Sequence, residues 1–373
     1  MGSLTTGFLL ILFAALCGGA FALPIKLRKR FELENLYALA ALFTMIVLPL
    51  LAAALYLPHW QEAIAATSRA TMWRGLAFGF AWGLGAITFG YAISLVGLSI
   101  GYAIIMGINT AVGSILPFLA QSSGSVFQPA SLVVLCGIAG CVVGVAICGR
   151  AAYLRERATV ASAAAVAAGR QSVTQNAASR KSSNFGLGIL MCAISGVLSA
   201  CANLGFVFTS QVGEQAQQLG ASPVISGLGS WMLVYWGGFL ATILWFGGLQ
   251  IKKGTWRNNF GPRATHDLGL AVWMGVLWFL AMIPYGMGAY YLGRLGTSVG
   301  WAINIAASLI LANLLGFLTG EWSTAPRRAR NVLFAGLAVL VLAMAVLGRG
   351  NAMASSSQIS VNTLKKTALI AER

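Results

Sequence analysis

Charged side chains are scarce in this sequence: they make up 9% of its 373 residues, whereas 58% are hydrophobic. Ordinary soluble domains carry about a quarter charged residues, and a soluble fold could not cover so much apolar surface. A lipid bilayer solvates apolar side chains and leaves only the backbone groups to be bonded internally. The composition therefore excludes an ordinary soluble protein and indicates one embedded in a membrane.

The short alternating runs of an outer-membrane β-barrel are also missing. The apolar runs are instead continuous over about 20 residues, the length of a membrane-crossing helix. The net charge of +16 lies in the segments between these runs, as topology signals do, so it does not indicate a nucleic-acid partner. Residues 1–6 lack the basic start of a signal peptide, and we expect the first run to be retained.

The sequence has few residues suited to catalysis. Its six cysteines all lie in apolar runs without a C-x-x-C pair, which favours small buried residues over a metal or redox site. There is no P-loop and no nucleophile triad, and the two histidines lie at loop edges. We therefore predict no cofactor, no metal and no enzymatic activity; a membrane enzyme is the weakest alternative.

Ten apolar runs predict an all-α, polytopic membrane protein with ten transmembrane helices arranged as two inverted five-helix repeats. We expect residues 1–149 to form the first repeat, 150–184 a flexible cytoplasmic linker rich in Ala and Ser, 185–348 the second repeat, and 349–373 a disordered polar tail. The expected spans are 6–25, 35–57, 73–95, 98–120, 130–149, 185–209, 223–248, 268–291, 297–319 and 330–348.

The distribution of Lys and Arg predicts the orientation of the chain. With the N-terminus outside, 17 of the 24 basic residues fall in inside segments, and cytoplasmic loops are the ones enriched in Lys and Arg. We therefore expect a bacterial inner (plasma) membrane protein with both termini in the periplasm.

An internal repeat supports the two-half organisation. Residues 97–104 read GLSIGYAI and residues 296–303 read GTSVGWAI, an offset of 199 that also pairs Tyr91 with Tyr290 and Leu116 with Leu315. Five spans separate the two copies, so they run in opposite directions through the membrane. Inverted repeats of this kind are typical of secondary transporters, in which two similar halves rock around a central site. The glycines of the motif also fit close helix packing.

The string FGFAWGLGAITFGYAISLVGLSIG at residues 78–101 resembles the L-rhamnose–proton symporter family of the drug/metabolite transporter superfamily. A second match runs from Glu321 to Gly336, and a third surrounds Pro24 and Glu34. The chain departs from the family string at Ala86 and Ser94. The resemblance implies ten helices in two inverted halves, and secondary active import of a neutral sugar, L-rhamnose, with H⁺ by alternating access.

Two alternatives stay open. The chain is an exporter or carrier of another small metabolite, such as an amino acid, or it is a non-transporting membrane sugar sensor, which would bind sugar without flux. The sequence leaves open the coupling ion (a proton or Na⁺) and the oligomeric state.

A sugar site needs aromatic faces for C–H groups and amide or hydroxyl groups for the sugar hydroxyls. Buried polar groups are costly in lipid, so they tend to mark function; a single Asn can also simply bond a neighbouring helix. Trp301 and Asn304 are three residues apart, and Trp278 and Tyr285 seven, so each pair shares a helix face. The predicted substrate-binding residues are Trp82, Tyr91, Asn109, Asn203, Trp278, Tyr285, Trp301 and Asn304.

None of the eight acidic residues falls at the centre of a predicted span, so the deep carboxylate common in proton-coupled carriers is not visible. If protons drive transport, Glu34 at the inner end of the second span or Glu214 outside the sixth would have to serve. We expect Glu321 to pair with Arg327 or Arg328. Arg294 could meet substrate on the outer side or anchor to lipid headgroups, and we expect the second.

Overall fold

The computed structural model describes the chain except for residues 1, 22, 122–126, 169–184, 262–263 and 372–373. Its described residues form helices and turns with no strand, and ten helical segments are long and apolar enough to cross a membrane. This confirms the predicted all-α class and the ten crossings. The chain is a multi-pass membrane protein.

Several spans combine two or three consecutive helices because a π-helical turn or a bend interrupts the regular α-helix. In chain order the ten spans are built from α1 (Gly2–Ala20) and α2 (Leu23–Leu27); α3 (Leu33–Leu42), η1 (Phe43–Val47) and α4 (Leu48–Tyr56); α6 (Arg69–Val96); α7 (Leu98–Gln121); α8 (Pro129–Ala168); α10 (Phe185–Phe208) and α11 (Ser210–Gln218); α12 (Pro223–Thr242), η2 (Ile243–Gly247) and α13 (Gly248–Lys253); α14 (Thr265–Leu292); α15 (Gly296–Leu318); and α16 (Arg327–Ala371). Two short helices, α5 (Trp60–Ala66) and η3 (Thr255–Asn259), lie between spans.

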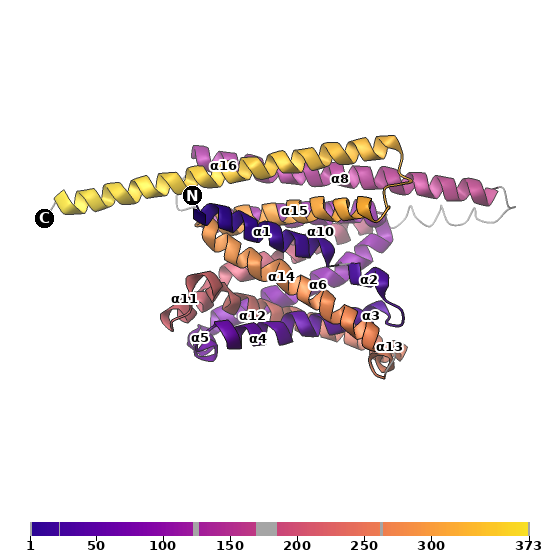
Figure 1. The fold of residues 1–373 in the computed structure, drawn as a ribbon, viewed down its shortest axis with the longest axis horizontal. Helices are drawn as coiled ribbons and strands as arrows, with labels where there is room; N and C mark the ends of the chain where they lie inside the picture. The colour runs from indigo at the N-terminus through magenta and orange to yellow at the C-terminus, as the bar shows by residue number, and fades with distance from the viewer. Residues whose placement is uncertain (1, 22, 122–126, 169–184, 262–263, 372–373) are drawn as a thin grey trace.

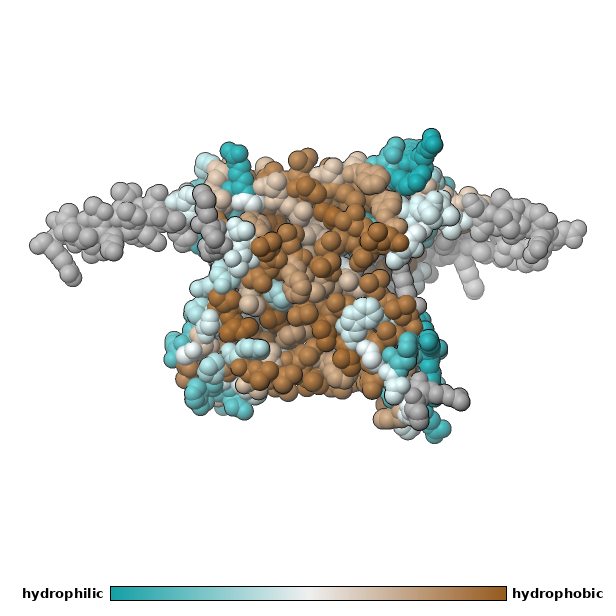
Figure 2. Space-filling model, viewed as in Figure 1, coloured by the Kyte–Doolittle hydropathy of each residue, from teal (hydrophilic) through white to brown (hydrophobic). Residues whose placement is uncertain are grey.

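The spans run roughly parallel to the horizontal axis of Figure 1, with α5 and α11 at one end and α2 and α13 at the other. We call these two ends the α11 face and the α13 face. Figure 2 shows a broad hydrophobic band between hydrophilic residues gathered at the two ends. Such a band is what a bilayer requires, because lipid contacts apolar side chains and water contacts the ends.

The helices α8 and α16 lie side by side along one edge of the molecule (Figure 1). Glycines on α8 allow this close approach: a Cβ atom on Gly137, Gly140 or Gly144 would press on Leu347, Ala343 or Leu340 of α16. Small residues at this spacing are typical of helix contacts in membranes.

Both helices are longer than a membrane requires. The 40 residues of α8 extend about 60 Å at 1.5 Å per residue, twice the roughly 30 Å of hydrocarbon. The sequence analysis placed a flexible linker from residue 150 and a disordered tail from residue 349. In the structure, helix continues to Ala168 and to Ala371. Alanine is the strongest helix former, and the Ala-rich composition at 151–168 favours helix over linker. The rest of the predicted linker, 169–184, lies outside the described residues.

The helix contacts are alike in the two halves of the chain. Of the first-half helices, α6 packs on α10 and α12, and α7 packs on α10 and α8. Of the second-half helices, α14 packs on α1 and α3, and α15 packs on α1 and α16, which are the same contacts with every span exchanged for the one five places away. Two bundles result: α6, α7, α10 and α12 form one, and α14, α15, α1 and α3 form the other. The helices α7 and α15 meet between them.

The contact between α6 and α12 depends on two facing glycines. A Cβ atom on Gly79 would overlap the carbonyl oxygen of Val234, and one on Gly237 would overlap the carbonyl oxygen of Leu76. The two backbones therefore touch directly, which only glycine permits.

A buried acid holds the α13 face together. Asp267, 1% exposed, accepts hydrogen bonds from the backbone N–H groups of Arg30 at 2.6 Å and Phe31 at 2.7 Å, and from Lys29 at 3.1 Å. Its Oδ1 also lies 2.8 Å from Nδ1 of His266. The carboxylate thereby fixes the turn between α2 and α3 to the start of α14.

The Asp267→Asn substitution is expected to destabilise the protein by about 1–3 kcal/mol, because an amide cannot accept all of these bonds and its NH₂ would face N–H donors. Thermal unfolding in detergent measures the change. The control is Glu62→Gln, because the Glu62 side chain is 66% exposed. Equal stability of the two variants would contradict this role for Asp267.

Candidate functional site

A buried hydrogen-bonded group joins the two bundles. Asn203 on α10 donates through Nδ2 to the carbonyl oxygens of Gly113 on α7, at 2.7 Å, and Thr297 on α15, at 3.1 Å. The hydroxyl of Tyr285 on α14 lies 2.6 Å from Oδ1 of Asn203 and 3.0 Å from the Thr297 carbonyl oxygen. One amide and one phenol thus connect four helices.

Aromatic rings continue from this group across the interface. The ring centroids of Trp301 and Tyr285 are 5.3 Å apart, and those of Tyr285 and Trp231 are 6.3 Å apart. Trp231 contacts Tyr235 at 5.7 Å. The row continues from Tyr235 to Trp82 at 6.1 Å and from Trp82 to Trp278 at 5.6 Å.

Polar atoms without a partner gather in the same region. Each is buried and has no hydrogen bond to any described residue. Leaving such an atom unpaired costs about 1–3 kcal/mol, and in a membrane protein it marks a place where a polar ligand or water would bind. Six of these atoms belong to α7, α12 and α15: Asn109 Oδ1, Ser114 Oγ, Trp231 Nε1, Tyr235 OH, Trp301 Nε1 and Asn304 Oδ1. We call the buried residues Asn109, Ser114, Asn203, Trp231, Tyr235, Tyr285, Trp301 and Asn304, with Trp82 and Trp278 beside them, the central cluster.

A pocket of about 630 Å³ lies between the bundles on the α11 face. Arg294 in the α14–α15 turn donates to the carbonyl oxygen of Gln121 at 2.9 Å, and the Gln121 side chain bonds the Thr297 hydroxyl. Arg294 was expected to anchor to headgroups or to meet substrate on the outer side; the structure places it on the wall of this pocket. The other polar side chains of the wall are Ser210, Glu214, Gln217, Ser226, Ser230 and Tyr290.

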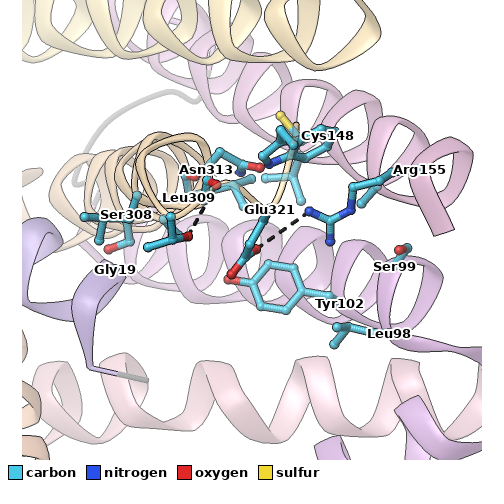
Figure 3. Close-up of a pocket in the computed structure, with 18 of the residues that line it drawn as sticks. Gly19, Leu98, Ser99, Tyr102, Cys148, Arg155, Ser308, Leu309, Asn313 and Glu321 are labelled. Carbon is cyan, nitrogen blue, oxygen red and sulfur yellow. Dashed lines mark hydrogen bonds and ion pairs between the residues drawn. The ribbon is translucent and has the colours of Figure 1, made fainter. Parts of the chain in front are cut away.

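A second cavity of about 370 Å³ lies between the bundles on the α13 face, against α8 (Figure 3). Arg155 of α8 and Glu321 of the α15–α16 turn point toward each other there, with Nη1 3.7 Å from Oε2, and the Arg155 guanidinium lies 4.6 Å from the centre of the Trp322 ring. Glu321 was expected to pair with Arg327 or Arg328; the structure pairs it with Arg155. Gly320, with φ of 77°, ends α15 in a left-handed turn that directs Glu321 back to the cavity.

The central cluster lies between the two cavities. Along α15, Thr297 lines the first cavity, Trp301 and Asn304 belong to the cluster, and the second cavity begins at Ser308. Ser308 lies eleven positions after Thr297, about 16 Å along the helix. Along α7 the same order runs in reverse, from Gln121 to Tyr102. The cluster therefore separates the two cavities, and none of its residues lines either one.

Seven of the eight predicted substrate-binding residues lie in the central cluster. The exception is Tyr91, which is 53% exposed on α6 and lines neither cavity. Trp231 and Tyr235 were not among the predicted residues. Their spacing of four on an apolar span, which puts two aromatic rings on one helix face, was the signal that could have revealed them.

The two acids suggested for ion coupling lie in different surroundings. Glu34 is 4% exposed and is held by Lys253, 3.2 Å away, and by the Thr255 hydroxyl. It lines neither cavity. Glu214 lies on the wall of the α11-face pocket, and Glu321 lies in the opposite cavity.

Among the described residues, no group of three or more His, Cys, Asp or Glu side chains could hold a metal ion. The site consists of aromatic, amide and hydroxyl groups, which suit a neutral polyhydroxylated ligand.

Comparisons with known proteins identify the family. Residues 1–355 match the family model described as L-rhamnose-proton symport protein (RhaT). Curated relatives named L-rhamnose-proton symporter include one from Cronobacter sakazakii, 26% identical, and one from Escherichia coli strain 55989, 24% identical; each match covers 94% of this chain and 99% of the relative. A solved crystal structure with 15% identity matches with a TM-score of 0.54 over 92% of this chain and 97% of its own, which shows a shared fold. Because the family model spans nearly the whole chain, the protein belongs to the L-rhamnose-proton symport protein family.

Proposed function

We propose that this protein imports L-rhamnose together with a proton, and that the central cluster is its sugar site. The family and the names of its relatives support the substrate and the ion. The six unpartnered polar atoms beside the row of aromatic rings carry the structural argument. A sugar would present hydroxyls to the polar atoms and C–H faces to the rings. No acidic or basic residue belongs to the cluster, which favours a neutral ligand over an amino acid.

Transport would proceed by alternating access between two inverted halves. The matching helix contacts of the halves and the offset of 199 in the sequence support this proposal. Two similar halves can adopt two mirrored arrangements of nearly equal energy, one open to each side. In this arrangement the bonds of Asn203 and Tyr285 close the path toward the α11 face.

We propose a bacterial inner-membrane location with the α11 face outside and the α13 face in the cytoplasm. The excess of Lys and Arg in segments that meet the α13 face supports this orientation. It places both termini in the periplasm. In this orientation the two halves of the described state must rearrange before the protein can take up sugar from the outside.

The coupling proton would bind a carboxylate that reaches the transport path. Glu214 and Glu321 line the two cavities, whereas Glu34 is held in an ion pair away from both. We propose Glu214 and Glu321 as the candidates, in place of Glu34.

The substrate is tested with purified protein in liposomes. Labelled L-rhamnose should accumulate when the interior is alkaline, and unlabelled L-rhamnose should compete while unlabelled amino acids should not. Tyr91→Ala is the control variant, because this ring lies outside the proposed site, and it should keep near-normal uptake. Transport of another solute without L-rhamnose uptake would overturn the substrate and leave the fold unaffected. Sugar binding without flux would indicate a sensor.

A further inference from the structure

The internal repeat assigns a counterpart to Trp301. At the offset of 199, Trp301 of α15 matches Tyr102 of α7, and Gly113 of α7 matches Ala312 of α15. If the halves are inverted copies, the contact of Trp301 with Gly113 on one side predicts a contact of Tyr102 with Ala312 on the other side. The structure allows the two places to be compared.

Trp301 closes the path on the α11 side. Its ring lies directly against Gly113, where a Cβ atom would overlap the indole, and the residue is 2% exposed. The ring meets Tyr285 of the preceding helix edge-on, at 71°. Next to it, Ser298 Oγ donates to the carbonyl oxygen of Ser114 at 2.7 Å and joins α15 to α7.

Tyr102 occupies the matching place on the α13 side, but there a cavity is present. Tyr102 and Ala312 both line the 370 Å³ cavity. The Tyr102 ring also meets an aromatic ring of its preceding helix edge-on, Phe89, at 6.0 Å and 87°. Ser99 and Asn313 match Ser298 and Ser114, yet among the described residues no hydrogen bond joins them.

Tyr102 lies on the face of α7 that also carries a residue of the proposed sugar site. It lies seven residues, about two helical turns, before Asn109 of the central cluster, so the two residues share a face of α7. Figure 3 shows Tyr102 on the cavity wall with Ser99 on the same helix and Asn313 across from them. A small movement of α7 toward α15 would carry the ring across the cavity to Ala312.

We infer that Tyr102 is a second sugar-contacting aromatic residue and the counterpart of Trp301. When the Trp301 ring moves away from Gly113, Tyr102 packs on Ala312 and covers the bound sugar from the α13 side. This inference rests on the proposed function for its ligand, a neutral hexose. The two rings would then alternate, one closing each side of the site.

The test uses thiol labelling of the full chain, which requires no sugar. All six native cysteines are replaced by alanine, and Ser308→Cys places one thiol deep in the α13-face cavity, on the cluster side of Ala312. A membrane-impermeant thiol reagent is applied from the α13 face. Ser210→Cys, at an exposed position of the opposite pocket, is labelled from the α11 face and serves as the control for folding.

Two mirrored substitutions should then give opposite results. In Gly113→Leu the new side chain occupies the place where the Trp301 ring packs, so the α11 side cannot close. The protein should then stay mostly in the state with the α13 side closed, and the thiol at position 308 should react about fivefold more slowly. In Ala312→Leu the new side chain occupies the place where the Tyr102 ring would pack, so the α13 side cannot close. The thiol at position 308 should therefore react as fast as in the parent. Equal labelling in the two variants would overturn the inference.

Two double variants assign the closure to Tyr102 itself. Tyr102→Ala added to Gly113→Leu should restore fast labelling, whereas Tyr102→Trp should keep the protection because an aromatic ring remains. Protection that survives Tyr102→Ala would show that another side chain closes the cavity. L-rhamnose uptake by the parent is measured separately. If the labelling rates change as expected but L-rhamnose is not taken up, the proposed substrate is rejected and the alternating closure by Trp301 and Tyr102 is retained.

Discussion

Replacing Tyr285 with phenylalanine is expected to lower the initial rate of L-rhamnose uptake about tenfold or more. The substitution keeps the ring, which contacts Trp301 and Trp231, and removes only the hydroxyl 2.6 Å from Asn203 Oδ1. A buried acceptor left without its donor costs about 1–3 kcal/mol, or roughly 5- to 150-fold in an equilibrium or a rate. Because Asn203 also holds α7 and α15 through its Nδ2, the loss should affect both the sugar site and its closure.

The control is Tyr91→Phe, which removes the same hydroxyl at a residue that is 53% exposed and lines neither cavity. Uptake by both variants is compared at equal amounts of protein in liposomes. Tyr91→Phe should remain within about twofold of the parent, the usual range for exposed substitutions. Similar rates for the two variants would show that the Tyr285 hydroxyl has no special part in transport.

The substitution Gly79→Leu is expected to abolish folding of the protein. A Cβ atom at this position already overlaps the Val234 carbonyl, so a leucine would force α6 and α12 apart along their contact. Overpacking a tight site costs about 1–3 kcal/mol when neighbours can shift, and more where backbone meets backbone. Gly79→Ala should give an intermediate loss.

The matched control lies eleven residues further along the same helix. A Cβ atom on Gly90 would meet nothing within 4 Å, so Gly90→Leu should keep the parent's yield of folded protein. Size-exclusion chromatography of the solubilised variants measures this yield. A monodisperse Gly79→Leu protein at the parent's yield would contradict the direct backbone contact.

Much of the fold could be predicted from the sequence, because a membrane imposes few alternatives. Continuous apolar runs predict helices of membrane length, and all ten are present. The spacing of Trp301 and Asn304 also predicted a shared face, and both residues are buried. Deep amides such as Asn203 could be identified because a polar group within a span needs a partner or a ligand.

The remaining features depend on which side of each helix faces protein. Lipid and protein interior are both apolar, so the pattern of apolar residues does not distinguish them; Tyr91 was expected inside and is exposed, whereas Trp231 and Tyr235 were overlooked and are buried. The overlap of Gly79 with α12 is a property of the contact between two helices, and no feature of either helix alone indicates it. The partner of Glu321 was missed for the same reason, since Arg155 lies 166 residues away in the chain on a helix that was expected to end earlier.

The most direct test of the account follows protons during sugar transport. Liposomes containing the protein, with no imposed gradient and a pH indicator outside, receive L-rhamnose in a sodium-free medium. The account predicts that the outside becomes more alkaline as L-rhamnose enters, and that Tyr285→Phe reduces the proton and sugar fluxes together. Entry of L-rhamnose without any change in outside pH, or only when Na⁺ is supplied, would contradict proton symport through this site.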